Sequence, residues 1–375
     1  MTATAREPLR LAMVGGGQGA FIGAVHRMAA RLDGEYRLVA GALSSRPDIA
    51  RASGAELGLE PGRSYPDFDT MIAAEAARPD GAQVVAVVTP NHMHLAPAAA
   101  ALRAGLHVIC DKPLAADPDL ALDFARGVAA DGPKFLLTHN YTGYPLMRQA
   151  RQMARSGELG EIRVVQAEYA QDWLAADVSN KQADWRTDPA RSGAGGAIGD
   201  IGTHAHNLLR FVTGLEVEAL AADLRACVPG RRVDDNANLM LRFAGGATGM
   251  LWASQVAVGQ ENGLRLRVYG TRGGIEWCQI DPNRMWVAEL GQPGRWMTRG
   301  GPGVTAAGAA GRVPPGHPEG YLEAFATLYR DFADVVRTGR DNPLLPGLAD
   351  GVEGMLFIKA ALASSAADGA WTRLR

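Results

Sequence analysis

The chain has 375 residues, a length that suits two domains, and its 47% apolar and 21% charged residues are ordinary for a folded globular protein. A formal net charge of −2 gives no field that would draw it to nucleic acid, so that partner class is not expected. Three cysteines without a paired spacing exclude a disulfide framework and a zinc motif, and we predict a reducing, cytoplasmic location. No apolar run approaches the roughly 20 residues that cross a bilayer, and no signal-peptide core precedes residue 10.

The first 140 residues alternate between short apolar runs and helical segments. Strands are predicted at residues 9–14, 36–43, 84–88, 107–110 and 134–138, and helices at 23–31, 96–104 and 117–130. The run Val84 to Val88 is almost entirely β-branched, which is typical of a parallel strand covered on both faces. Because strands alternate with helices, we predict an α/β fold whose residues 1–140 form a doubly wound Rossmann domain.

Residues 141–375 are predicted to form a second, α+β domain with a large, mainly antiparallel open sheet. Its strands are expected at 162–173, 217–226, 236–243, 248–258, 264–269 and 275–279, and its helices at 144–156, 321–337 and 347–365. In the strand 236–243, apolar residues alternate with polar ones, so one sheet face is buried and the other faces solvent or another subunit. We expect the last helix to pack back on the Rossmann domain. The Gly- and Pro-rich stretch 300–320 is a long loop, of the kind that forms lids, interface arms or disordered segments.

A glycine turn follows the first predicted strand. Gly15 and Gly17 allow a tight turn and a close backbone approach to a pyrophosphate, whose charge the next helix N-terminus meets. Ala20 stands where a third glycine is usual, and Gly23 begins the more convincing helix, so 18–22 are predicted to be an enlarged turn. The cofactor contacts expected here are Gly15, Gly17, Gln18, Ala20, Phe21 and Ile22. A purely structural glycine turn is the alternative, which its position after the first strand of a βαβ series disfavours.

The end of the second strand bears on the choice between NAD and NADP. A carboxylate there would bind the ribose 2′-hydroxyl of NAD, but this chain has Ser44, Ser45 and Arg46. Hydroxyls and a guanidinium accept a 2′-phosphate, which favours NADP or the use of both nucleotides. Arg46 stacked on adenine or pointing to solvent is the alternative.

Further ligand contacts are predicted where two other strands end. The central strand is followed by Thr89, Pro90, Asn91 and His94, at the sheet edge where open α/β folds bind their ligands. The next strand is followed by Asp111 and Lys112, the latter held in extended geometry by Pro113. An ammonium group there can bind a substrate hydroxyl, stabilise a developing alkoxide and relay a proton. Taken alone, a lysine at a strand end is more often a surface residue.

The second half contains one candidate catalytic pair, Asp200 and His204. Residues four apart on a helix share one face, so the carboxylate can orient the imidazole and raise its basicity. The structural alternative is that Asp200 caps the helix and that His204 only provides it with a hydrogen-bond partner. His204 and His206 point apart on a helix, and no metal site is predicted.

Substrate contacts are expected from polar and aromatic residues near these strand ends. They are Asn140, Tyr141, Trp173, Lys181, Trp185, Arg186, Asp200 and His204. Aromatic faces beside hydrogen-bonding groups suit a polyol, although the tryptophans alone fit packing roles equally well. Lys181 and Arg186 could also bind a carboxylate, phosphate or sulfonate. His317 and Tyr321, at the end of the long loop, are candidates to close the site or reach a neighbouring subunit.

Taken together, these motifs resemble the Gfo/Idh/MocA oxidoreductases over nearly the whole chain. The resemblance is carried by the Gly15-x-Gly17 turn with His26 downstream, by Asp111-Lys112-Pro113, where the family commonly has Glu-Lys-Pro, and by the Asp-x-x-x-His of 200–204. It implies a Rossmann domain, NAD or NADP, a catalytic trio of Lys112, Asp200 and His204, and a homodimer or homotetramer formed through the second sheet.

The activity that the resemblance implies is hydride transfer between the nicotinamide and a carbinol carbon of a sugar, sugar derivative or cyclitol. His204 or Lys112 is expected to take the hydroxyl proton while Asp200 holds His204. Two alternatives remain open at this point. One is a glycosidase that oxidises the sugar only transiently, and the other is a non-catalytic dinucleotide-binding sensor.

Overall fold

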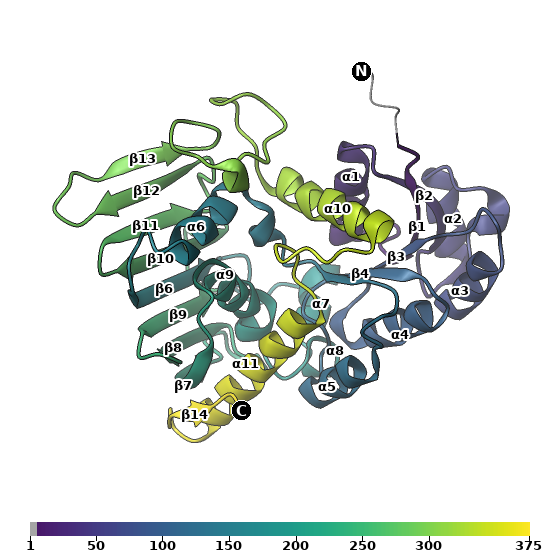
Figure 1. Cartoon of the computed structure of the whole chain (residues 1–375). Coiled ribbons are helices and arrows are strands. Elements are labelled where there is room, and N and C mark those ends of the chain that lie inside the picture. Colours follow the sequence, from purple (N-terminus) through teal and green to yellow (C-terminus); the bar gives the residue numbers. More distant parts are fainter. Residues whose placement is uncertain (1–5) are drawn as a thin grey trace, which may run out of the picture. The chain divides into compact units, whose positions relative to one another are not determined.

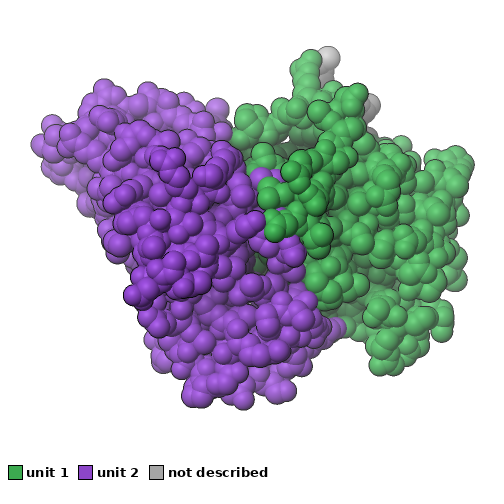
Figure 2. All heavy atoms as spheres, turned by 90° about the horizontal axis from the view of Figure 1, so that it is seen from below, with its two compact units in different colours: residues 1–115, 119–140, 321–351 green, residues 116–118, 141–320, 352–375 purple. Residues whose placement is uncertain are grey.

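The computed structural model describes residues 6–375 and divides the chain into two compact units. Unit 1 contains residues 1–115, 119–140 and 321–351, and unit 2 contains 116–118, 141–320 and 352–375; Figure 2 colours them separately. Helix α10 (Tyr321–Thr338), which the sequence places in the second domain, therefore belongs to the unit with the Rossmann sheet. Helix α11 (Leu348–Ala366) belongs to unit 2 from Val352 onward.

Unit 1 is built on a five-stranded parallel sheet with the order β2-β1-β3-β4-β5 (Figure 1). Its strands are β1 (Leu9–Gly15), β2 (Tyr36–Ala42), β3 (Val84–Val88), β4 (His107–Cys110) and β5 (Phe135–Leu137). The parallel Rossmann sheet predicted from the sequence is confirmed. Because β2 and β3 lie on opposite sides of β1, the strand order reverses beside β1, and ligands of such sheets bind at that point.

The helices of unit 1 include two that the sequence patterns did not predict, α2 and α3. The full set is α1 (Phe21–Leu32), α2 (Pro47–Glu56), α3 (Phe68–Ala76), α4 (Leu95–Arg103), α5 (Pro118–Gly127) and α10, with 3₁₀ turns η1 (Pro61–Arg63) and η2 (Asn91–Met93). A third 3₁₀ turn, η3 (Asn140–Gly143), begins in unit 1 and belongs to unit 2 from Tyr141 onward. Helix α10 packs on α1, where the Tyr329 hydroxyl lies 2.8 Å from Nδ1 of the buried His26. Tyr36 Oη donates to the Tyr329 carbonyl at 3.0 Å.

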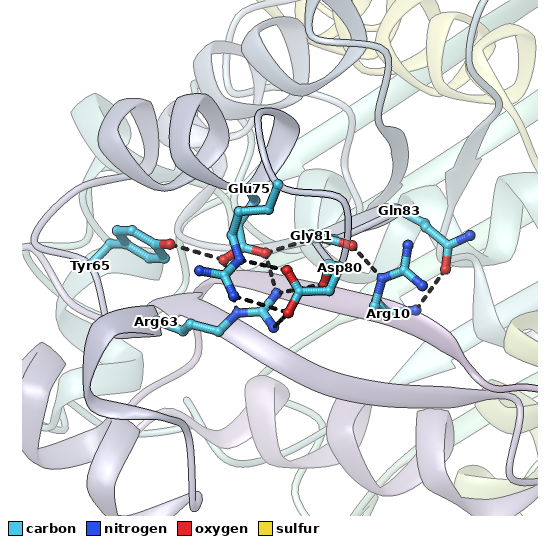
Figure 3. Close-up of polar contacts among 9 residues, drawn as sticks. Arg10, Arg63, Tyr65, Glu75, Asp80, Gly81 and Gln83 are labelled. Carbon is cyan, nitrogen blue, oxygen red and sulfur yellow. Dashed lines mark hydrogen bonds and ion pairs between the residues drawn. The ribbon is translucent and has the colours of Figure 1, made fainter.

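A buried ion pair joins the segments that precede β3 (Figure 3). The Arg63 guanidinium donates two hydrogen bonds to the Glu75 carboxylate, and both side chains are almost completely buried. Tyr65 Oη and the Ala82 N–H also donate to Glu75, each at 2.9 Å. Burial, together with this carboxylate, raises the pKa of Tyr65 to about 12. The exposed Asp80 carboxylate lies 3.8 Å from Arg63 Nη1, so Glu75 is the principal counter-ion.

We expect Glu75→Gln to destabilise unit 1 by about 3 kcal/mol or more, because it leaves the Arg63 guanidinium buried without its main anion. Urea unfolding followed by circular dichroism measures the change. Asp80→Asn is the matched control, since an exposed partner contributes less than about 1 kcal/mol. Equal unfolding midpoints for wild type and Glu75→Gln would contradict the expected role of this pair.

Unit 2 is built on a nine-stranded sheet with the order β13-β12-β11-β10-β6-β9-β8-β7-β14. The strands are β6 (Ile162–Ala170), β7 (Val217–Arg225), β8 (Asn236–Phe243), β9 (Thr248–Ser254), β10 (Gly263–Gly270), β11 (Gly273–Cys278), β12 (Arg284–Glu289), β13 (Arg295–Thr298) and β14 (Thr372–Arg373). All neighbours pair antiparallel except β6 and β9, which confirms the predicted sheet type. The alternation predicted for β8 is confirmed, because Ala237, Leu239, Leu241 and Phe243 are buried.

Unit 2 contains further helices, some of which pack on one face of this sheet (Figure 1). They are α6 (Pro145–Arg155), α7 (Lys181–Arg186), α8 (Pro189–Ser192), the π-helical segment η4 (Ile198–Gly202) and α9 (Thr203–Thr213), with a short 3₁₀ turn η5 (Ala306–Gly308). Helix α9 packs on β6 and β10, and α6 packs on α9. No helix within the described residues combines the length and the apolar character that crossing a bilayer requires.

The long loop 300–320 has a defined conformation set by two buried charges. The Arg299 guanidinium donates to the carbonyl oxygens of Val313 at 3.0 Å and Pro314 at 3.2 Å, and the Glu319 carboxylate accepts the Val313 N–H at 2.9 Å. Asn283 ties both charges to β12, accepting from Arg299 at 3.1 Å and donating to the Glu319 carbonyl at 2.9 Å. The loop is therefore an ordered part of unit 2.

Candidate active site

The glycine turn after β1 is shaped for close backbone packing. Gly15 and Gly16 have φ of 80° and 74°, which residues with a Cβ rarely adopt. A Cβ on Gly17 would lie 2.6 Å from the Leu43 carbonyl oxygen. The Gly17 N–H donates to that same oxygen at 3.0 Å. The turn is thus fixed against the end of β2 by its own backbone.

The third glycine of the turn is Gly23, not a residue in position 20. A Cβ on Gly23 would meet the Gly16 Cα at 2.3 Å, so glycine is needed where α1 crosses the turn. Helix α1 begins at Phe21, which corrects the expectation that residues 18–22 form one enlarged turn. Ala20, at the N-cap, has no side-chain acceptor, and the first turn has no acidic residue. Gln18 is held by its N–H to Ser53 Oγ at 3.0 Å, and Ile22 lies in the helix. An uncapped helix N-terminus behind a glycine cradle fits a dinucleotide pyrophosphate.

The loop after β3 adds buried polar groups beside this cradle. The Thr89 side chain lies next to Gly15, and its Oγ1 is buried with no hydrogen-bond partner among the described residues. Pro90 leads into η2, which contains the buried Asn91. His94 is 1% exposed, and its two ring nitrogens lie 2.8 Å from the Pro113 carbonyl oxygen and 2.9 Å from that of Thr89. Burial lowers the pKa of His94, against the opposing charge of Asp111. His94 therefore links two loops from the interior.

The end of β2 places Ser44, Ser45 and Arg46 before α2. The Arg46 guanidinium donates to the Asp48 carboxylate at 2.8 Å, and both side chains are exposed. The Arg46 N–H also donates to Ser44 Oγ at 3.2 Å. The guanidinium that favours NADP on sequence grounds therefore already has a carboxylate partner.

Asp111 and Lys112 follow β4 as predicted. The Asp111 carboxylate accepts the Thr138 hydroxyl at 2.8 Å and the Lys112 N–H at 3.0 Å. Burial by itself raises the pKa of Asp111, but the interaction with His26 and the Lys112 charge outweigh it and lower that pKa well below its usual range. Asn140, at the start of η3, is also buried, and its Nδ2 has no hydrogen-bond partner within residues 6–375.

In unit 2, Asp200 lies in the π-helical segment η4, and His204 lies in the first turn of α9. The sequence predicted one regular helix, and the π segment changes the spacing of side chains around the axis. This segment begins at the Asp234 carboxylate, which accepts the N–H groups of Gly196 at 2.6 Å and Ile198 at 2.8 Å. A Cβ on Gly196 would lie 2.0 Å from the Asp234 carbonyl oxygen, so that glycine is required. π-helical turns are frequent at functional sites.

The Asp200 carboxylate is held by groups from two other elements. Its Oδ2 accepts from Arg186 Nε at 3.2 Å and from Gln255 Nε2 at 3.0 Å. The Arg186 guanidinium stacks over the rings of Trp185 and Trp173, at 4.2 and 5.7 Å from their centroids. Of the predicted substrate contacts, Arg186 therefore bonds to Asp200 and the two tryptophans contact Arg186, whereas Lys181 is exposed at the start of α7.

Aromatic rings surround His204. The Tyr141 ring meets the imidazole edge-on at 4.9 Å, and the Tyr169 ring lies 6.1 Å away. The two phenol oxygens are 2.5 Å apart, and Tyr169 donates to Asn262 Oδ1 at 2.9 Å. Burial raises the pKa of Tyr141, and the Asp200 charge acts in the same direction.

Several of these residues were missed by sequence reasoning: Tyr169, Asp234, Gln255 and Asn262. Gln255 had the clearest signal, because it follows β9 directly. Lys112 belongs to unit 1, and Asp200 and His204 belong to unit 2. Among the described residues, no group of three or more His, Cys, Asp or Glu is arranged to hold a metal ion.

Asp234 provides a pH test of this site. Burial and the like charge of Asp235 outweigh the two N–H donors and raise the pKa of Asp234 to about 6. Because the folded state holds this proton more tightly than the unfolded chain, the stabilisation is complete below about pH 4 and is lost as the pH rises through about 6. The raised pKa corresponds to about 3 kcal/mol.

We expect Asp234→Asn to lower stability by about 1–3 kcal/mol at neutral pH, because an amide N–H₂ faces a backbone N–H. The stability difference between wild type and variant should shrink from pH 4 to pH 6.5, measured by denaturant unfolding at each pH. Parallel pH dependences in the two proteins would show that Asp234 does not titrate in this range.

The fold and these residues define an oxidoreductase with an NAD-binding Rossmann domain. Residues 9–139 match the family model described as "Oxidoreductase family, NAD-binding Rossmann fold", and residues 147–276 match the GFO/IDH/MocA C-terminal domain. The chain belongs to the Gfo/Idh/MocA family.

Similar proteins span the whole chain. An oxidoreductase structure from Sinorhizobium meliloti is 50% identical, with a TM-score of 0.91, over 98% of this chain and 100% of the other. An inositol dehydrogenase homolog from Azotobacter vinelandii, solved with NADH and myo-inositol, is 36% identical, with a TM-score of 0.90, over 98% of each chain. Levoglucosan dehydrogenase of Pseudarthrobacter phenanthrenivorans is 29% identical over 97% of this chain and 98% of its own length.

Proposed function

We propose that this oxidoreductase is a dehydrogenase for an uncharged sugar or cyclitol, acting on a carbinol carbon. The observation that carries the proposal is the composition of the cluster around Asp200 and His204. Its aromatic faces, Tyr141, Tyr169 and Trp173, suit the C–H faces of a polyol ring, and its amides and hydroxyls suit the polyol hydroxyl groups.

The state of Arg186 argues against an anionic substrate. Its guanidinium already donates to the Asp200 carboxylate and, through Nη1, to the Gln182 side chain at 2.7 Å. With Nε and Nη1 already engaged, only part of this guanidinium is left for a substrate carboxylate or phosphate, which would also meet the negative charge of Asp200 beside it. The relatives named above support the same class, since one is a dehydrogenase of levoglucosan and another was solved with myo-inositol.

The proposed oxidation of the alcohol has two parts, the removal of a proton from the hydroxyl and the transfer of a hydride from the carbon. When bound, the nicotinamide ring accepts the hydride from the carbinol carbon. We propose that His204 or Lys112 takes the hydroxyl proton and that the Lys112 ammonium stabilises the negative charge that develops on the oxygen. Asp200 is proposed to orient His204. The atoms balance because the alcohol loses one hydride and one proton and becomes a carbonyl.

For the nucleotide, we propose that the enzyme uses NAD and accepts NADP less well. A 2′-phosphate reaching Arg46 must displace the Asp48 carboxylate. Because an exposed ion pair contributes only about 0–1 kcal/mol, this competition weakens NADP binding without excluding it. The proposed contacts are those of the glycine turn, the β2 end and the loops after β3 and β4.

The test is turnover of myo-inositol, levoglucosan and L-sorbose with NAD and with NADP, followed by nicotinamide absorbance. Lys112→Met and His204→Ala should each lower kcat by about 10²–10⁴-fold, because each removes a proton-transfer or charge-stabilising group. Lys359→Met, an exposed lysine of α11, is the control. Near-normal turnover in both site variants would remove the assignment.

Two outcomes of the same assay identify the alternatives. Release of an alcohol from a methyl glycoside, with no net absorbance change, would identify transient oxidation in a glycosidase. Binding of the nucleotide with no turnover of any substrate would identify a sensor.

We further propose a homodimer or homotetramer formed through the uncovered face of the unit 2 sheet. Met240 of β8 and Met250 of β9 pair directly in the sheet, and they are 55% and 57% exposed. Large side chains of this kind are typical of interface surfaces.

Met250→Lys should shift the protein toward smaller assemblies in light scattering, because it buries a charge between subunits. Met28→Lys, on an exposed position of α1, is the control. A monomeric wild type would contradict the proposal.

A further inference from the structure

We infer that Arg186 and Gln255 are positioning residues that hold the Asp200 carboxylate in one orientation. This inference rests on the proposed function, because it explains how that site is arranged. It assigns to Arg186 a role different from the substrate contact expected from its sequence position.

Two donors from separate elements converge on one oxygen. Arg186 belongs to α7, Gln255 follows β9, and both donate to Asp200 Oδ2, at 3.2 and 3.0 Å. A carboxylate turns about two side-chain bonds, and two donors from different directions remove that freedom. The position of Oδ1 is then set by the surrounding fold and not by the π segment alone.

Arg186 is itself fixed before it reaches Asp200. Its Nη1 donates to the Gln182 carbonyl at 3.3 Å and to the Gln182 side chain at 2.7 Å. Its planar group lies over Trp185 and is also near Trp173, and the Trp173 indole N–H donates to Gln171 at 3.0 Å. A guanidinium held in this way presents Nε to Asp200 with little rotational freedom.

Gln255 is fixed by backbone hydrogen bonds. Its N–H donates to the Asp235 carbonyl at 2.8 Å, its carbonyl accepts the Leu174 N–H at 3.2 Å, and the residue is 3% exposed. The amide therefore reaches Asp200 from a rigid strand end. It supplies a neutral donor beside the cationic one.

The charges around Asp200 predict a change in the pH profile. The cation that donates to the Asp200 carboxylate is Arg186 on α7, and the second donor, Gln255, is neutral. The neighbouring titratable groups are the Tyr141 phenol on η3 and the His204 imidazole on α9. A bonded cation favours the ionised carboxylate, so its removal should move the acid limb of the kcat profile to higher pH.

The experiment is a double-mutant cycle between Arg186→Met and Asp200→Asn on the full-length enzyme, with myo-inositol or levoglucosan and NAD. We expect Arg186→Met to lower kcat by about 10–100-fold, with less than about threefold change in KM, because the carboxylate loses its orientation. In the Asp200→Asn background, the same change should cost less than about threefold. Arg186→Lys should recover part of the loss and restore the acid limb, and Gln255→Glu should move that limb up by placing a like charge on Asp200.

Arg191→Met, on the neighbouring α8, is the matched control, and NADH fluorescence titration reports whether each variant still binds nucleotide. Multiplicative losses in the double mutant, or an Arg186→Met effect confined to KM, would overturn the inference, since Arg186 would then act on the substrate directly. Near-normal turnover of Asp200→Asn would instead overturn the proposed site itself. The two failures are therefore distinguishable.

Discussion

The two N–H groups accepted by the Asp234 carboxylate decide where the segment carrying Asp200 and His204 begins. A helix N-terminus leaves its first N–H groups without partners inside the helix, and here a buried side chain from just before β8 supplies the acceptor. Gly196 permits the contact, because a Cβ there would meet the Asp234 backbone. The π segment, and with it the direction in which Asp200 points, starts from this junction.

In unit 1, too, a glycine permits the close contact that fixes the start of a helix. The Gly16–Gly23 approach fixes the start of α1 against the turn after β1, and α10 covers α1 through the His26 and Tyr329 contact. The glycine turn is rigid because the backbone packs on itself and on the end of β2. Rigid placement of backbone N–H groups is what recognition of a pyrophosphate requires.

Patterns of apolar residues were sufficient to predict the parallel sheet, the antiparallel sheet and most of their strands, because burial on one or both faces leaves a clear period. They did not predict α2, whose small and polar residues give no such period, or α3, whose apolar residues Phe68, Met71 and Ile72 span little more than one turn. The candidate residues Lys112, Asp200 and His204 could be named from motif and spacing alone. The π segment could not, because its hydrogen bonds depend on Asp234, about 35 residues further along the chain. Arg186 was named from its position, but only the contact with Asp200 distinguishes a positioning role from a substrate contact.

The direction of the hydrogen bonds beside His204 also bears on the kind of ligand that fits. Asn262 Oδ1 accepts from both Tyr169 and Gln171, at 2.9 and 2.7 Å, and an amide oxygen cannot donate. Tyr169 therefore donates its only hydroxyl proton to Asn262, so Tyr141 must be the donor in the 2.5 Å hydrogen bond between the two phenols. With its proton committed, the Tyr141 oxygen can only accept from any further group. Such an oxygen complements the hydroxyl of an alcohol and not the carbonyl of its oxidised product. In the proposed function, this polarity would favour a polyol hydroxyl over a carbonyl group at Tyr141.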